Sequence, residues 1–273
     1  MGAALRIRAG YEISFDCPQP TPMLLLLNVH PSREADLESP DTLRTDPQVP
    51  VRQYRDLFGN VVSRLVARSG RNTFSTSFVI RDSGLCDAPL PRIGQSAVED
   101  LPDDVVLYLL GSRYCETDQL SDLAWSLFGG IEPGAVRVQA ILDYVHNHVG
   151  FGYEHARATR TALQAHEEQK GVCRDFAHLA ITLCRCMNIP ARYCTGYLGD
   201  IGVPASPAPM DFSAWFEVYL GGEWRTCDAR HNRPRIGRVV MARGRDATDV
   251  AISTAFGVAT LTGFEVVTEK VLD

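Results

Sequence analysis

The sequence predicts an α+β protein in which a β-rich N-terminal part precedes a core of helices and strands. Three observations carry this prediction. Short segments rich in β-forming residues and separated by turn residues continue to about residue 98. Apolar residues then recur at helical spacing from residue 118 onward. Finally, a helix that starts at Cys173 leads into a strand, and a β-hairpin follows it.

The composition excludes several classes of protein. The chain has 273 residues, of which 45% are hydrophobic and 22% are charged, so it is long enough for one large domain or two modest ones. A net charge of -6 argues against a general binder of nucleic acid or of anionic membranes. The apolar run at residues 24–27 is too short to span a bilayer, and no signal sequence is recognised. We therefore expect a cytoplasmic protein with no nucleic-acid or membrane partner, and its eight cysteines to be reduced thiols.

The N-terminal segments predict a β-sandwich-like domain over residues 1–98. Its expected strands are residues 11–15, 23–29, 61–67 and 73–81. Residues 56–60, with Gly59, form the expected turn between two of its strands.

A loop between these strands carries several possible metal ligands. They are His30, Asp36, Glu38, Asp41 and Asp46. They lie in a proline-punctuated segment without ligand spacing, which favours a solvated loop and no metal site. An acidic segment that contains proline, residues 99–104, precedes the change from strand-like to helical periodicity. We place the domain boundary there and assign residues 99–273 to the core domain.

Three helices are expected before Cys173. Residues 118–128 and 133–149 carry apolar stripes, and Pro133 suits the first position of the second helix. Thr161 is a suitable N-cap for a short helix over residues 162–168. His146 and His148 lie two residues apart, hence on different helix faces, which favours surface histidines over metal ligands.

Cys173 is the candidate nucleophile. It opens a helix whose exposed backbone N–H groups and dipole would favour its thiolate. The buried stripe of this helix is Phe176, Ala180, Leu183, Cys184 and Met187, and the helix ends before Pro190. The alternative is that Cys173 is only a small buried residue. Cys184, Cys186 and Cys194 diverge in direction, which favours packing over a metal site. A strand at residues 191–198 and a Gly- and Pro-rich loop at residues 199–209, expected to border the cleft, follow.

The hairpin after this loop sets a register. Residues 212–220 alternate between two faces, and Gly221-Gly222 fits a two-residue turn. This turn pairs Leu220 with Glu223 and, counting back, Trp215 with Asp228. Asp228 then lies diagonal to Ser213 on the non-core face of the hairpin.

These segments resemble the transglutaminase-like superfamily. The resemblance rests on GVCRDFAHL at residues 171–179, IPARY at 189–193, GY at 196–197 and AWFEVYLGGEWRTCDARHN at 214–232. Within the superfamily, the chain looks like the bacterial transglutaminase-like cysteine peptidases with an N-terminal β domain. This resemblance implies a papain-like core, in which the helix that bears the cysteine packs on an antiparallel sheet. It implies no cofactor and no metal.

The family's Cys-His-Asp triad carries over only in part. Cys173 and Asp228 match its first and last members, whereas Ser213 occupies the position of the catalytic histidine. His178 is about 140° around the helix from Cys173, so it is expected to face away from the thiol. His231 follows Asp228 by three residues and is a possible surrogate base, although loop histidines are more often solvated. The backbone N–H of Cys173 is the candidate oxyanion donor.

Two functions remain open. The first is thiol-dependent acyl transfer or amide and peptide hydrolysis at Cys173, impaired or unusual because the histidine is replaced. The second is an inactive pseudoenzyme whose cleft binds a peptide or protein, with Trp215 and Tyr219 as aromatic contacts. Four arginines near the C-terminus, Arg235, Arg238, Arg243 and Arg245, suit either an anion site or an edge strand.

Overall fold

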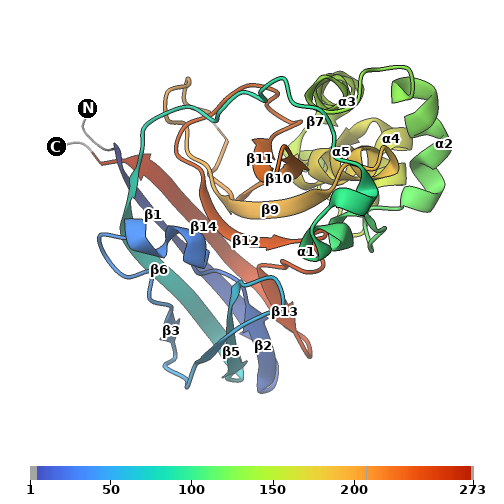
Figure 1. Ribbon diagram of the computed structural model, residues 1–273. Coiled ribbons are helices and arrows are strands. Elements are labelled where there is room, and N and C mark those ends of the chain that lie inside the picture. Colours follow the sequence, from blue (N-terminus) through green and yellow to red (C-terminus); the bar gives the residue numbers. More distant parts are fainter. Residues whose placement is uncertain (1–4, 207, 272–273) are drawn as a thin grey trace.

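The computed structural model describes residues 5–206 and 208–271. The first four residues of the expected β-rich domain, and residue 207 of the expected loop at residues 199–209, lie outside this description. Figure 1 shows a strand-rich unit on one side and helices on the other, with a curved sheet between them. The mixed α+β architecture is as predicted from the sequence.

The strand-rich unit consists of two four-stranded sheets, ordered β14-β1-β6-β3 and β13-β2-β5-β4. Its N-terminal strands are β1 (Leu5–Cys17), β2 (Thr21–Leu25), β3 (Arg44–Asp46), β4 (Arg52–Arg55), β5 (Val61–Ala67) and β6 (Gly70–Asp82). Four of them contain or overlap the four expected strands. The turn between β4 and β5 forms as expected, with Gly59 at a φ of 81°.

The last two strands of the chain belong to this unit. β13 (Ser253–Ala255) pairs with β2, and β14 (Thr260–Lys270) pairs along most of β1. In Figure 1 the red C-terminal strand lies beside the blue N-terminal strand. The division expected at residue 99 therefore differs from the structure, because the chain returns to complete the sandwich. Local periodicity can indicate that a segment is a strand, but it does not indicate which other strand the segment pairs with.

The core places helices against one face of a four-stranded antiparallel sheet, ordered β11-β10-β9-β12. Its strands are β9 (Ala191–Tyr197), β10 (Ser213–Leu220), β11 (Glu223–Cys227) and β12 (Val239–Gly244). The helices are α1 (Asp103–Val106), α2 (Thr117–Phe128), α3 (Ala135–His148), α4 (Ala162–Glu168) and α5 (Cys173–Cys186). One apolar cluster joins α2, α3 and α5 to the inner face of β10.

Short elements complete the chain. They are η1 (Pro31–Asp36), η2 (Val98–Asp100), η3 (Leu107–Leu109), η4 (Tyr153–His155) and the parallel pair β7 (Gly150–Phe151) and β8 (Lys170–Gly171). Thr161 caps α4 as predicted, because its side chain accepts the N–H of Gln164 and the Gln164 side chain accepts the N–H of Thr161.

The two units share apolar contacts. Tyr197, Phe212 and Val239 of the core lie in the same buried cluster as Ile7 and Phe78 of the sandwich. A linker, residues 83–97, runs from β6 toward the helices. Along the way, Cys86 forms an isolated antiparallel β-bridge with Ile236 of the core. No helix in the described part of the chain is long and apolar enough to cross a membrane.

Candidate active site

Cys173 is the first residue of α5, as the sequence predicts. The turn before it is fixed by Asp175, whose carboxylate accepts the N–H of Val172 at 2.9 Å. Gly171 makes room for this arrangement, since a Cβ at that position would lie 2.6 Å from the Cβ of Asp175. Gly171 and Asp175 therefore act together to place Cys173 at the start of the helix.

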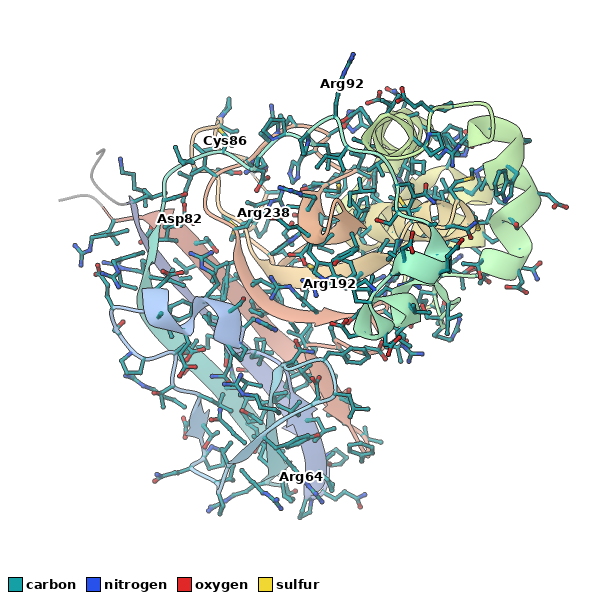
Figure 2. The ribbon with its side chains drawn as sticks, in the orientation of Figure 1. Arg64, Asp82, Cys86, Arg92, Arg192 and Arg238 are labelled. Carbon is teal, nitrogen blue, oxygen red and sulfur yellow. The ribbon has the colours of Figure 1, made fainter. Side chains whose placement is uncertain are left out.

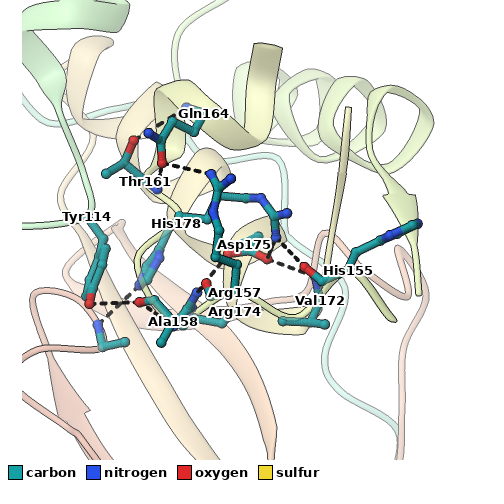
Figure 3. A network of polar contacts seen from close by, with 12 residues as sticks. Tyr114, His155, Arg157, Ala158, Thr161, Gln164, Val172, Arg174, Asp175 and His178 are labelled. Atoms are coloured by element: carbon teal, nitrogen blue, oxygen red, sulfur yellow. Dashed lines mark hydrogen bonds and ion pairs between the residues drawn. The ribbon is translucent and has the colours of Figure 1, made fainter. Parts of the chain in front are cut away.

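A buried ion pair supports the same turn. Arg160 and Asp175 are both almost fully buried, and Arg160 Nη1 donates to Asp175 Oδ2 at 3.0 Å. Arg174 donates to the other oxygen of Asp175 and to the carbonyls of Arg157 and Ala158. Figure 3 shows this network converging on Asp175 at the start of α5. The approach segment before α5 is thus tied to the helix that carries Cys173.

The thiol is protonated in its resting environment. Burial raises the pKa of Cys173 to about 11, although the Arg230 charge and the backbone N–H of Ala214 act in the opposite direction. The sequence predicts that the helix N-terminus favours the thiolate. Burial outweighs the Arg230 charge and the Ala214 N–H, so we expect Cys173 to need a base to become a nucleophile near neutral pH.

The hairpin register is as predicted. Leu220 pairs with Glu223 and Phe216 pairs with Cys227, so Asp228 follows directly at the end of β11. Gly221 and Gly222 form the turn with φ values of 62° and 82°. The apolar face of β10 packs on the helices, while Trp215 on the other face is buried with Cys194 and Val240. Both faces of β10 are therefore covered.

His231 is hydrogen-bonded to Asp228. The ring nitrogen Nδ1 of His231 lies 2.8 Å from Asp228 Oδ2, and the backbone N–H of His231 donates to Asp228 Oδ1 at 3.0 Å. Burial alone would raise the pKa of Asp228, but the His231 hydrogen bond and the Arg238 charge hold it well below its usual range. An ionised carboxylate on Nδ1 selects the tautomer in which Nε2 carries no proton.

Ser213 lies beside this pair. It is 5% exposed, and its Oγ has no hydrogen-bond partner among the described residues. Ser213 and His231 line the same small cavity, of about 60 Å³, together with Tyr153, Asp211 and Arg230. Residues of the loop 199–209 close its other side, as expected for a loop that borders the cleft. The structure thus brings Ser213, His231 and Asp228 together.

His146 supports the loop that carries His231, a role that the sequence did not indicate. Its Nδ1 lies 2.9 Å from the carbonyl oxygen of Arg230 and 3.2 Å from that of Ala229. Because carbonyls only accept, this nitrogen donates. His146 is a surface histidine, as predicted, but its contact could not be found from spacing alone. The neighbouring His148 stacks on His166 and contacts its carbonyl.

The remaining histidine and cysteine candidates are buried among other side chains of the fold. His178 is buried, stacks on Tyr114 and accepts the N–H of Ala247, and burial lowers its pKa to about 3. Cys184 and Cys194 are fully buried in apolar clusters. The described residues contain no group of three or more His, Cys, Asp or Glu side chains that could hold a metal ion.

The four C-terminal arginines all contact carboxylates within the chain. Arg243 binds Glu217, Arg245 binds Asp249 and Arg235 approaches Asp200. Arg238 binds both Asp228 and Asp87. β12 is an edge strand, but of the four arginines only Arg243 lies within it. Each of the four guanidinium groups already contacts a carboxylate of this chain.

Comparison with known proteins identifies the core. Residues 121–229 match the family model described as the transglutaminase-like superfamily. An uncharacterized protein of Mycobacterium leprae is 32% identical over 112 residues, which cover 40% of this chain and 38% of that protein. The aligned part thus spans well under half the length of that relative.

The fold has a solved counterpart over its whole length. A protein from Cytophaga hutchinsonii, described as a putative cysteine protease, is 30% identical with a TM-score of 0.86. The alignment covers 100% of this chain and 92% of that chain. Its identity and coverage, with the family match over the helices and the hairpin, show that this chain belongs to the transglutaminase-like superfamily.

Proposed function

We propose that the protein is a thiol-dependent acyl-transfer enzyme that hydrolyses or transfers amide-linked acyl groups, with Cys173 as nucleophile. The observation that carries the proposal is the His231–Asp228 contact of 2.8 Å. It supplies an imidazole where Ser213 replaces the family's histidine. The base comes from three residues after Asp228 and not from the start of β10.

The chemistry follows from these groups. The unprotonated Nε2 of His231 takes the proton of the Cys173 thiol as the sulfur attacks the acyl carbon. The proton then passes to the departing amine nitrogen, which leaves a thioester on Cys173. Water or a second amine, deprotonated by His231, attacks the thioester and releases the thiol. The backbone N–H of Cys173, which has no intrahelical acceptor, is the candidate donor to the oxyanion.

The substrate class proposed is a peptide or protein. The resemblance to bacterial transglutaminase-like cysteine peptidases and the likeness to the Cytophaga protein support it. The cytoplasm, with reduced thiols, is the proposed location, since a reduced Cys173 is required for the reaction.

A pair of histidine variants tests the base. Alkylation of Cys173 by iodoacetamide is followed against pH by mass spectrometry, with the exposed Cys86 as the internal reference. With a pKa of about 11, a thiol has roughly one part in ten thousand as thiolate at pH 7, so unassisted alkylation is slow. We expect assisted alkylation in the wild type and about 10²-fold slower alkylation in His231→Ala.

The control is His155→Ala, because His155 is half-buried on the approach segment and has no contact with Asp228 in the described structure. It should alkylate like the wild type. Peptide hydrolysis should be lost in Cys173→Ala and reduced in His231→Ala. If the wild-type and His231→Ala profiles coincide and rise only toward pH 11, His231 is not the base.

The second candidate function is a binding module without catalysis. The small size of the cavity beside Ser213 favours it. Trp215 is 2% exposed and stacks under Arg238, so it does not offer the aromatic contact that we expected from the hairpin pattern. Retention of every cellular function by Cys173→Ala would favour binding over catalysis.

A further inference from the structure

Arg238 joins the site to a distant part of the chain. It is 9% exposed, its Nη2 donates to Asp228 Oδ2 at 2.7 Å and its Nε donates to Asp87 Oδ2 at 2.8 Å. Its guanidinium also lies 5.0 Å from the centre of the Trp215 ring. Figure 2 shows Arg238 in the interior of the molecule, whereas Arg92 of the linker points outward. Both hydrogen bonds that the Arg238 guanidinium donates in the described structure are thus directed at Asp228 or at the linker.

The linker is fixed where it meets Arg238. The N–H of Asp87 donates to the carbonyl of Arg235 at 2.8 Å, and the Asp87 carboxylate accepts the N–H of Arg235 at 3.0 Å. Gly237 turns the chain between Arg235 and Arg238 with a φ of 80°. A Cβ at position 237 would lie 2.8 Å from the Ile7 side chain. Asp87 is therefore a rigid anchor and not a mobile surface carboxylate.

Arg238 and His231 share one oxygen. Both the Arg238 guanidinium and His231 Nδ1 contact Asp228 Oδ2, while Oδ1 accepts the backbone N–H of His231. The arginine therefore fixes the rotation of the carboxylate that orients the imidazole. It also neutralises a negative charge that would otherwise stabilise an imidazolium beside it.

We propose that Arg238, anchored by Asp87, is a positioning residue that orients Asp228 toward His231 and, by neutralising the carboxylate, disfavours the imidazolium form of the ring. The inference rests on the proposed function for the identity of the base. Arg238 acts through Asp228 and does not contact the thiol.

Other charged groups face His231 from the cavity that it lines. They are Arg230, Arg235, Asp200, Asp211 and, as a phenol, Tyr153. Cys173 lies near enough to Arg230 and Asp228 for their charges to act on its thiol. The two arginines oppose an imidazolium and the two aspartates favour it. Arg238 differs from all of them because it alone of the described arginines donates to the carboxylate that holds the imidazole.

The experiment compares four variants of the full-length protein. Arg238→Met removes the charge, Arg238→Lys keeps it, and Asp87→Asn removes the anchor's charge. Arg243→Met is the matched control, because Arg243 forms a comparable ion pair with Glu217 on the same sheet without contacting Asp228. Peptide hydrolysis is measured against pH, together with unfolding by denaturant and the ¹⁵N spectrum of the histidine rings.

We expect kcat to fall about 10- to 100-fold in Arg238→Met with little change in KM, since part of the general-base contribution is lost and no substrate contact is removed. The acid limb of its pH profile should move to higher pH, because the unneutralised carboxylate favours protonation of the Asp228–His231 pair. Arg238→Lys should restore the position of this limb and part of kcat. Arg243→Met should lose stability but keep the wild-type profile.

A double-mutant cycle tests the anchor. If Asp87 acts through Arg238, Asp87→Asn lowers kcat in the wild type and has no further effect in Arg238→Met. Additive effects would overturn the chain from Asp87 to Asp228. An unchanged pH profile in a folded Arg238→Met protein would show that the pair is merely structural.

The ¹⁵N spectrum separates this inference from the proposed function. At equal pH it should show a larger share of the imidazolium form of His231 in Arg238→Met than in the wild type. This readout needs no turnover. If the protein neither hydrolyses nor transfers amide-linked acyl groups of peptides, the proposed function fails, while an unaltered spectrum in Arg238→Met overturns the role of Arg238.

Discussion

At position 213 a serine hydroxyl lies buried beside a cavity of about 60 Å³, two residues along β10 from the strand position that faces Asp228. Its hydroxyl has no hydrogen-bond partner among the described residues, whereas His231 reaches Asp228 from the following loop. Under the proposed function, position 231 supplies the imidazole that the family resemblance places at position 213.

Moving the base tests this equivalence. In a His231→Ala background, Ser213→His should recover at least about 10-fold of the lost alkylation and hydrolysis rate, because the general-base contribution is typically about 10²–10⁴-fold. The vacated His231 site and the adjacent cavity leave space for the new ring. Rates are measured for the single and double variants after folding has been checked.

Ser213→Asn in the same background is the size control, because an amide cannot accept the thiol proton. It should not recover activity. Equal rates for the histidine and asparagine variants would mean that residue 213 does not point between Asp228 and Cys173, and the orientation assigned to β10 would be wrong.

At the scale of elements, the start of α5 depends on the buried carboxylate of Asp175. Asp175 is 1% exposed, caps the helix through the N–H of Val172 and pairs with Arg160. Breaking a buried pair by removing one partner leaves an uncompensated charge, which is strongly destabilising. The helix that presents Cys173 is held by this pair as well as by its apolar stripe.

Asp175→Ala should therefore lower the free energy of unfolding by about 3–5 kcal/mol. The matched control is Asp118→Ala, which removes an acidic residue from the first turn of α2 but breaks no ion pair in the described structure and should cost at most about 1 kcal/mol. Unfolding by urea gives both values. A cost for Asp175→Ala as small as that of Asp118→Ala would contradict the role assigned to the Arg160–Asp175 pair.

At the scale of the whole molecule, the two ends of the chain meet. β14 runs antiparallel to β1, so the sandwich forms only after the core has been synthesised. The sandwich and the core also share apolar side chains, such as Tyr197 packed on Phe78. We therefore expect the two units to unfold together.

A substitution in β14 measures this coupling. Val266→Asp places a carboxylate at a position that is 6% exposed within the sandwich cluster, and should cost about 3 kcal/mol. All three tryptophans, Trp125, Trp215 and Trp224, lie in the core. Their fluorescence transition should move to lower denaturant in step with the circular-dichroism transition.

The adjacent Val267→Asp is the control, because Val267 is 45% exposed and the change should shift neither transition by more than about 0.5 kcal/mol. A fluorescence transition that stays at its wild-type midpoint in Val266→Asp, while the circular-dichroism signal of the strands is lost, would show two independently stable units.

The sequence by itself determined the features that depend on short-range patterns. The start of α5 at Cys173, the cap at Thr161 and the pairing of Leu220 with Glu223 follow from helical periodicity, capping chemistry and a Gly-Gly turn. The superfamily was also visible, because its motifs lie in these same continuous segments. Ser213 and Asp228 could be placed near each other because a hairpin register is local.

Only the tertiary structure decided the environment of the thiol and its neighbours. The pKa of Cys173 is raised because burial outweighs the Arg230 charge and the Ala214 N–H, and burial is a property of the packed fold. Arg238 meets Asp87 across 151 positions of sequence, and β14 meets β1 across most of the chain. Such contacts leave no periodic signal, since charge pairing and strand pairing depend on where the folded chain returns and not on local spacing.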